Sequence, residues 1–132
     1  MSPQEQQAVR KIVTAGMRLM YDKKMFSMLK AGLSKGVPMA DKLANETAGL
    51  MKLLQDKANG SIPRQLLVPA AAMLMTELAK FMEDSGMPAP TPADIKAAYA
   101  KLVPLLAKAI PKPVAARMQP QATPPQPGLI GA

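Results

Sequence analysis

The sequence predicts an all-α fold: a small, irregular bundle of four or five helices, followed by an extended, Pro-rich C-terminal arm. Two observations predict it. Apolar residues recur at helical spacing up to residue 110, and helix start and stop signals divide them into segments. Beyond residue 110 no period survives, and the last 22 residues hold six of the fourteen prolines. We therefore expect a helical bundle over 1–110 and an extended arm over 111–132.

The first helix is predicted to run from Ser2 to about Asp22. Ser2 can cap it, Pro3 suits the first helical position, and Glu5 stands where a capping box needs an acid. Its apolar positions follow the helical period: Val9, Ile12, Val13, Gly16, Met17 and Met20. Residues 22–30 either continue this helix or form a short second one, which the glycines that follow would end.

The next helix is predicted over 38–58, and Asn59-Gly60 stops it. One stripe of it is expected to face the core: Leu43, Thr47, Leu50, Met51, Leu54 and Ala58. Gly16 and Gly49 both lie inside predicted helices, where a glycine costs roughly 0.5–1 kcal/mol relative to alanine. That cost predicts a close approach of another helix at both positions.

A further helix is predicted over 61–84, with Ser61 or Ile62 at its cap and Ser85-Gly86 ending it. Residues 66–75 are apolar nearly all round, which indicates a central, buried helix, and the run is too short to span a bilayer. Pro69 predicts either a kink or a delayed start.

The last helix follows an extended linker over 87–92. Thr91 is its predicted cap, Pro92 takes the first position, and Asp94 replaces the usual glutamate of a capping box. Its buried stripe is Ile95, Ala98, Tyr99, Leu102, Leu106 and Ile110. Pro104 stands inside this helix and is expected to bend it.

Composition excludes several kinds of chemistry. The chain has no cysteine and no histidine, so it lacks disulfides, zinc ligands of these types and the commonest general base. A Walker loop and a GxGxxG motif are also missing from the sequence. We expect no enzymatic activity, no cofactor and no small-molecule substrate.

Acidic residues are the remaining catalytic candidates. Glu83 and Asp84 are adjacent and point about 100° apart on a helix. Asp41 and Glu46, five residues apart, are poorly aligned, and Glu46 and Asp56 fall on different turns. We interpret all of these as solvated helix faces.

Glu77 follows the apolar run and is the exception. A buried carboxylate at this place could carry a function. The more ordinary expectation is a position at the edge of the buried face, paired with Lys80 three residues on.

Positive charge is concentrated near the N-terminus of a chain with net charge +8. The candidate residues for a nucleic acid or an anionic surface are Arg10, Lys11, Arg18, Lys23 and Lys24. Aromatic residues for base stacking do not stand beside them. Any contact with DNA would therefore be to phosphate, salt-sensitive and independent of sequence, and an anionic membrane is the alternative surface.

The C-terminal arm is the predicted partner-docking segment. Its prolines favour an extended chain and its tip is apolar. The residues expected to dock are Pro113, Pro120, Pro124, Pro125, Pro127, Leu129 and Ile130. The chain also has twelve methionines, which either fill the core or line a face that adapts to a partner.

The segments YDKKMFSMLKAG (21–32) and GLMKLLQDKANGSIPRQLLVPAAAMLMTELAKFMEDSG (49–86) resemble small all-helical virion proteins of tailed bacteriophages, those of the head–tail or ejection apparatus. The likeness includes no diagnostic motif, so no functional residue is transferred from it. It implies a structural protein present in many copies, made in the host cytoplasm without a secretory signal and bound to other structural proteins of a virion.

The leading hypothesis is thus a non-enzymatic structural component of a large assembly. Two alternatives belong to other classes of protein. One is a membrane-active DNA-ejection protein in which the helix over 64–82 refolds or oligomerises in a host bilayer. The other is a sequence-independent nucleic-acid-binding protein that uses the basic residues near the N-terminus.

Overall fold

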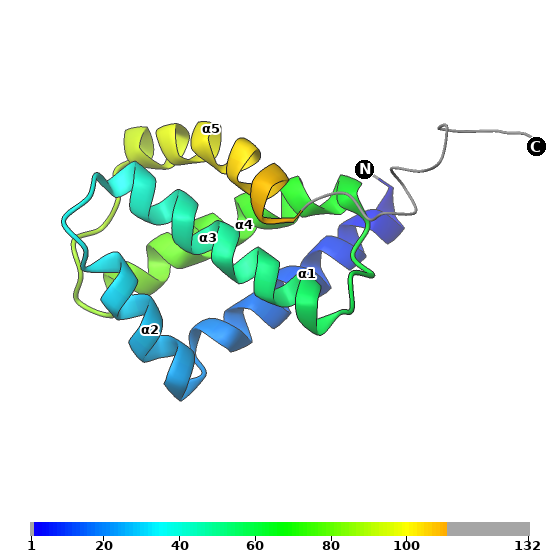
Figure 1. Cartoon of the computed structure of the whole chain (residues 1–132), viewed down its shortest axis with the longest axis horizontal. Coiled ribbons are helices and arrows are strands. Elements are labelled where there is room, and N and C mark those ends of the chain that lie inside the picture. Colours follow the sequence, from blue (N-terminus) through cyan, green and yellow to red (C-terminus); the bar gives the residue numbers. More distant parts are fainter. Residues whose placement is uncertain (1, 111–132) are drawn as a thin grey trace, which may run out of the picture.

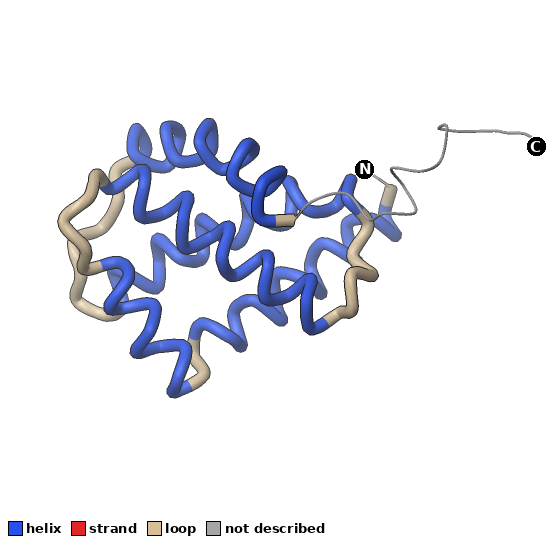
Figure 2. Tube along the Cα trace, viewed as in Figure 1, coloured by secondary structure: helices blue, strands red, loops and turns tan. Residues whose placement is uncertain are grey.

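The computed structural model describes residues 2–110, and within this part of the chain the fold is all-α. Five helices and their connecting loops account for all of it, without a strand (Figure 2). The helices are α1 (Pro3–Met20), α2 (Lys23–Leu33), α3 (Met39–Lys57), α4 (Arg64–Asp84) and α5 (Pro92–Ala109). The predicted docking residues of the C-terminal arm lie outside the described residues.

Helices α3 and α4 form the centre of the bundle (Figure 1). Helix α5 packs mainly on α3, α1 mainly on α4, and α2 on the neighbouring parts of α1 and α3. All five helices contribute to one hydrophobic core, which is the single bundle predicted for this part of the chain. Its largest fully buried side chains are Phe81, Met20, Leu33, Leu43, Leu50, Met51, Leu74, Met75, Leu78, Met82 and Leu102.

Three of the four aromatic rings meet at one place, and the fourth, Tyr99, is exposed on α5. Phe81 is wholly buried, and the rings of Tyr21 and Phe26 stand edge-on to it, with centroids 5.5 and 5.0 Å away. Edge-to-face pairs at this spacing add about 0.5–1.5 kcal/mol beyond the buried area. The cluster ties the turn between α1 and α2 to the end of α4.

Two capping boxes begin helices at the predicted places. The amide of Glu5 donates to the Ser2 hydroxyl at 3.1 Å, and the Ser2 amide donates back to the Glu5 carboxylate at 3.0 Å. Thr91 and Asp94 make the same pair of bonds at the start of α5, at 3.1 and 2.9 Å. In the first box, the hydrogen bonds with Ser2 lower the pKa of Glu5, and the bond from the Ser2 backbone amide contributes most.

The predicted stop signals also end their helices. After α3, Asn59 takes a left-handed φ of 55°, and the Gly60 amide reaches back to the Gln55 carbonyl at 2.8 Å. After α4, Gly86 has φ 75° and the Met87 amide donates to the Met82 carbonyl at 2.9 Å. Both are Schellman motifs, which pair the last carbonyls of a helix.

Three predictions about helix boundaries are settled or corrected. Residues 22–30 do not continue the first helix: α1 ends at Met20, and the Asp22 carboxylate caps a separate α2. Neither Ser61 nor Ile62 caps α4, because Pro63 is the N-cap residue and makes no side-chain bond. The helix begins before Pro69 and continues through it, so the start is not delayed.

The two helix-interior glycines differ. A Cβ at Gly16 would stand 2.7 Å from Leu74 Cδ1, so α1 approaches α4 as closely as predicted. At Gly49 nothing lies within 4 Å of such a Cβ, and the residue is exposed. The predicted close approach at Gly49 is therefore wrong within the bundle.

The loop between α3 and α4 is held by one side chain that the sequence pattern did not single out. Gln55 Nε2 donates to the Ile62 carbonyl at 3.0 Å, and Gln55 Oε1 accepts from the Ile62 amide at 2.9 Å. At the start of α4, Arg64 Nη1 donates to the Ile110 carbonyl at 2.9 Å. This bond joins the end of α5 to the start of α4.

Candidate functional site

A groove lies between α2 and α3, and we call it the α2–α3 groove. It encloses about 710 Å³, and the end of α1 closes one side of it. From α3 it takes Glu46, Gly49, Leu50, Leu53 and Lys57, which lie on one helix face at i, i+3, i+4, i+7 and i+11. The groove therefore follows α3 for about 16 Å, three helical turns.

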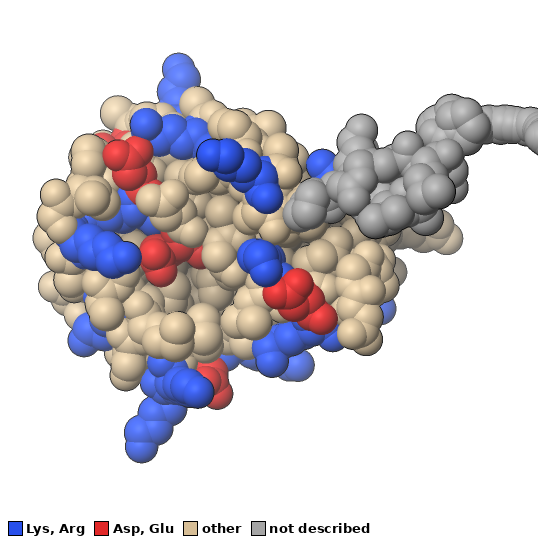
Figure 3. All heavy atoms as spheres, in the orientation of Figure 1, with Lys and Arg blue, Asp and Glu red and all other residues tan. Residues whose placement is uncertain are grey.

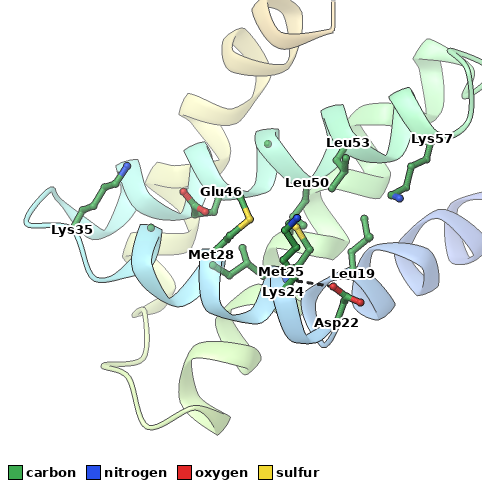
Figure 4. Close-up of a pocket in the computed structure, with 13 residues that line it drawn as sticks. Leu19, Asp22, Lys24, Met25, Met28, Lys35, Glu46, Leu50, Leu53 and Lys57 are labelled. Carbon is green, nitrogen blue, oxygen red and sulfur yellow. Dashed lines mark hydrogen bonds between the residues drawn. The ribbon is translucent and has the colours of Figure 1, made fainter.

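The floor of this groove is apolar and rich in methionine. Met25, Met28 and Leu29 of α2 face Leu50 and Leu53 of α3 across it. In Figure 4 the side chains of Met25 and Met28 lie between the two helices, and Met28 keeps 58% of its surface exposed. Methionine is flexible and polarisable, so such a floor can adapt to the shape of a partner.

Lysines stand around the rim. Lys35 lies at one end of the groove and Lys57 at the other, with Lys24 between them on the α2 side (Figure 4). None of the three forms an ion pair with a residue in the range 2–110. The ion pairs of the described chain lie elsewhere, at Lys52–Asp56, Lys80–Glu77 and Lys101–Asp41.

One carboxylate stands inside the groove. Burial raises the pKa of Glu46, and the charge of Lys35 opposes that shift. A Cβ on Gly32 would lie 2.7 Å from the Glu46 carboxyl carbon, so the absence of a side chain at Gly32 makes room for the carboxylate. The prediction of a solvated face holds only in part for Glu46, because its side chain is half-buried where α2 packs against it.

A smaller cavity of about 440 Å³ lies between α1 and α3, and we call it the α1–α3 groove. Its lining is largely apolar, with Lys11 and Arg18 from α1 at its edge. Leu19 and Lys57 line both this groove and the α2–α3 groove. The two therefore adjoin each other.

The predicted basic residues are divided by the fold. Lys11 and Arg18 lie at the α1–α3 groove, and Lys24 lies at the α2–α3 groove. Arg10 and Lys23 are exposed and line neither groove. Figure 3 shows Lys and Arg spread over the visible face with Asp and Glu among them, rather than collected in one stripe.

A third groove, of about 640 Å³, lies between α3 and α5. The ion pair between Lys101 Nζ and Asp41 Oδ1, at 3.0 Å, stands at it. This pair joins the two helices across the groove and so serves their packing. The prediction of a solvated face holds for Asp41 only in part, since its carboxylate has a partner on another helix.

The remaining carboxylates show no convergence on a reaction centre. Glu77 pairs with Lys80 at 3.4 Å at the edge of the buried face, as predicted. Over residues 2–110, no group of three or more acidic side chains gathers where it could hold a metal ion. The chemistry that these surfaces offer is apolar contact and charge pairing.

Helix α4 is the one described helix that is long and apolar enough, by length and composition, to cross a membrane. Half of its most apolar window is buried within the bundle. Within the run 66–75, which the sequence predicted to be buried, Leu66, Leu67, Ala70, Ala71, Leu74 and Met75 are buried, but Met73 is 44% exposed.

Comparison with known protein families, with curated proteins and with solved structures finds no match to the chain.

Proposed function

We propose that this protein is a non-enzymatic structural component of a large protein assembly, a phage virion, which binds neighbouring subunits through its helical body and its C-terminal arm. The observation that carries the proposal is the α2–α3 groove, an adaptable apolar floor under unpaired lysines. Such a surface suits contact with another macromolecule, because it combines apolar area with charges at its rim.

The virion part of the proposal rests on the resemblance of residues 21–32 and 49–86 to phage structural proteins. The composition of the C-terminal arm supports it independently. A Pro-rich chain already favours an extended shape, so it loses less conformational entropy on binding than a Gly-rich chain does. Many-copy assembly would multiply such contacts.

Deletion of residues 111–132 tests this function. Because the core lies within residues 9–110, the truncated chain should keep its helix content and melt within a few degrees of the full chain. It should, however, fail to enter the assembly. Circular dichroism and co-sedimentation with native particles measure the two effects. A truncated chain that enters the particles at the level of the full chain would contradict the role of the arm.

One observation favours a second candidate, a membrane-active DNA-ejection protein. Helix α4 has the length and composition of a membrane span. The central helix of a soluble bundle has the same properties, so this candidate comes second. Dye release from anionic liposomes by the full chain would support it, and complete inertness towards such liposomes would exclude it.

A further inference from the structure

We infer that the α2–α3 groove is a docking site for an acidic amphipathic helix of a partner protein. This inference rests on the proposed function and names the kind of partner that the helical body would bind. Three properties of the groove carry it: its shape, its charge and the glycine in its wall.

The shape suits a helix. The groove lies between two helices and follows α3 for three turns, about 16 Å. An apolar stripe at i, i+3, i+4 and i+7 of a partner helix would lie along the floor formed by Met25, Met28, Leu50 and Leu53. Side chains of methionine adjust to such stripes without a large loss of packing.

The charge selects an acidic partner. Together, the α2–α3 groove and the adjoining α1–α3 groove present five cations, Lys11, Arg18, Lys24, Lys35 and Lys57. They present only two carboxylates, Asp22 and Glu46. Asp22 already accepts a hydrogen bond from the Met25 amide at 3.4 Å, and Glu46 lies inside the groove rather than on its rim. Glutamates on both flanks of a partner helix would therefore meet unpaired lysines.

Gly49 supplies an independent argument. A glycine in the middle of α3 costs roughly 0.5–1 kcal/mol, and no other helix of the described bundle uses the space above it. It nevertheless stands in the wall of the groove, on the same face as Leu50 and Leu53. A partner helix in the groove would pass close to the α3 backbone at this glycine, which gives the residue a role that the isolated bundle does not.

The experiment uses the full chain and a synthetic 18-residue helical peptide with a leucine stripe and glutamates on both flanks. Fluorescence anisotropy measures binding, and amide chemical shifts locate the site. We expect the peptide to bind at the α2–α3 groove and to bind more weakly as salt is raised. A peptide with the same stripe and lysine flanks should bind at least tenfold more weakly.

Two pairs of variants locate the effect. A Cβ at Gly49 would have no atom within 4 Å, so Gly49→Leu places a bulky side chain in the groove and should weaken binding at least tenfold, while Ala97→Leu, on the exposed face of α5, should not. Lys24→Glu should weaken binding several-fold, and Lys96→Glu, which makes the same charge change on α5, should not. Melting curves confirm that each variant is folded.

Other results would overturn the inference. These are an absence of binding at millimolar peptide, equal or tighter binding of the lysine-flanked peptide, or full affinity in Gly49→Leu. Self-association of the full chain that Gly49→Leu abolishes would make a second copy the occupant. Binding to phosphatidylglycerol vesicles that Gly49→Leu abolishes would make the surface a lipid site.

The failure of this inference differs from a failure of the proposed function. If Gly49→Leu enters native particles as the unchanged chain does, the groove is not the docking site although the structural role stands. If the unchanged chain never occurs in a particle, the structural role fails whatever the peptide does.

Discussion

Gly16 and Gly49 occupy similar positions inside α1 and α3 but have different surroundings. Leu74 fills the space in front of Gly16 and is itself wholly buried, so an added methyl group would require a shift of packed side chains in the core. The space in front of Gly49 is open. A contact within the bundle therefore accounts for Gly16, whereas no contact within the described bundle accounts for Gly49.

Gly16→Ala should destabilise the protein. An added methyl group in a packed interface costs about 1–3 kcal/mol, and only part of that is returned by the higher helix propensity of alanine. Gly49→Ala should instead stabilise the protein by about 0.5–1 kcal/mol. Urea unfolding of both variants measures the difference. A stabilised Gly16→Ala would show that α1 and α4 are not in contact at this position.

Glu46 is the carboxylate whose environment the fold changes most. Burial disfavours its charged form and so raises its pKa, which means that the folded state binds a proton more readily than the unfolded state. Stability should then fall as pH rises from the ordinary glutamate pKa through the raised value, and the loss is complete above that value.

Glu46→Gln should therefore be more stable than the unchanged chain at neutral pH, because it removes the partly desolvated charge. The difference should shrink as pH falls through the raised pKa and vanish below the ordinary one. Unfolding midpoints between pH 3 and 8 measure this, and Glu83→Gln, at an exposed position of α4, controls for the loss of one negative charge. A less stable Glu46→Gln at neutral pH would mean that the carboxylate has a stabilising partner.

At the scale of the elements, Gln55 holds the loop between α3 and α4 in place. Gln55→Ala would leave both backbone groups of Ile62 without their partner, and two such hydrogen bonds contribute about 1–3 kcal/mol together. Gln55→Glu keeps the acceptor but sets a carboxylate oxygen against the Ile62 carbonyl at a buried position, so it should also destabilise the protein at neutral pH. Equilibrium unfolding measures both, with the exposed Gln65→Ala as the control. An unchanged midpoint in Gln55→Ala would show that the loop is held by other contacts.

Helix boundaries were predictable where the signal is local. The capping boxes at Ser2 and Thr91 and the stops at Asn59 and Gly86 depend on residues three to five positions apart, so the sequence pattern contains all of their partners. The cap of α4 was not predictable in this way. Pro63 holds the N-cap position through its own backbone geometry, and no side-chain bond marks it.

Features that depend on distant residues were missed. Glu46 looks like any exposed acid along α3, and only the packing of Gly32 from α2 covers it. Thr47 was correctly placed in the buried stripe, but its hydroxyl has no hydrogen-bond partner in the structure, which its helical spacing could not indicate. The α2–α3 groove likewise appears only when Met25 and Met28 are set opposite Leu50.

At the scale of the whole molecule, the fold distributes the methionines and the N-terminal basic residues over different parts of the surface and the core. Most of the buried apolar residues belong to α3 and α4. Four methionines are fully buried in the core, Met20, Met51, Met75 and Met82. Met25 and Met28 instead line the α2–α3 groove, so the expectation that the methionines fill the core holds for only part of the set. The five basic residues near the N-terminus are spread over two grooves and open surface, which does not favour a single nucleic-acid stripe.

The central claim is that the chain functions within a large assembly, and the mass of the native complex that contains it is the most direct test. The full chain should be purified under gentle conditions from the cells that produce it, and sedimented. The account predicts that it sediments with a particle far larger than itself, in several copies per particle. If the chain sediments as a single monomer under all of these conditions, the account is contradicted.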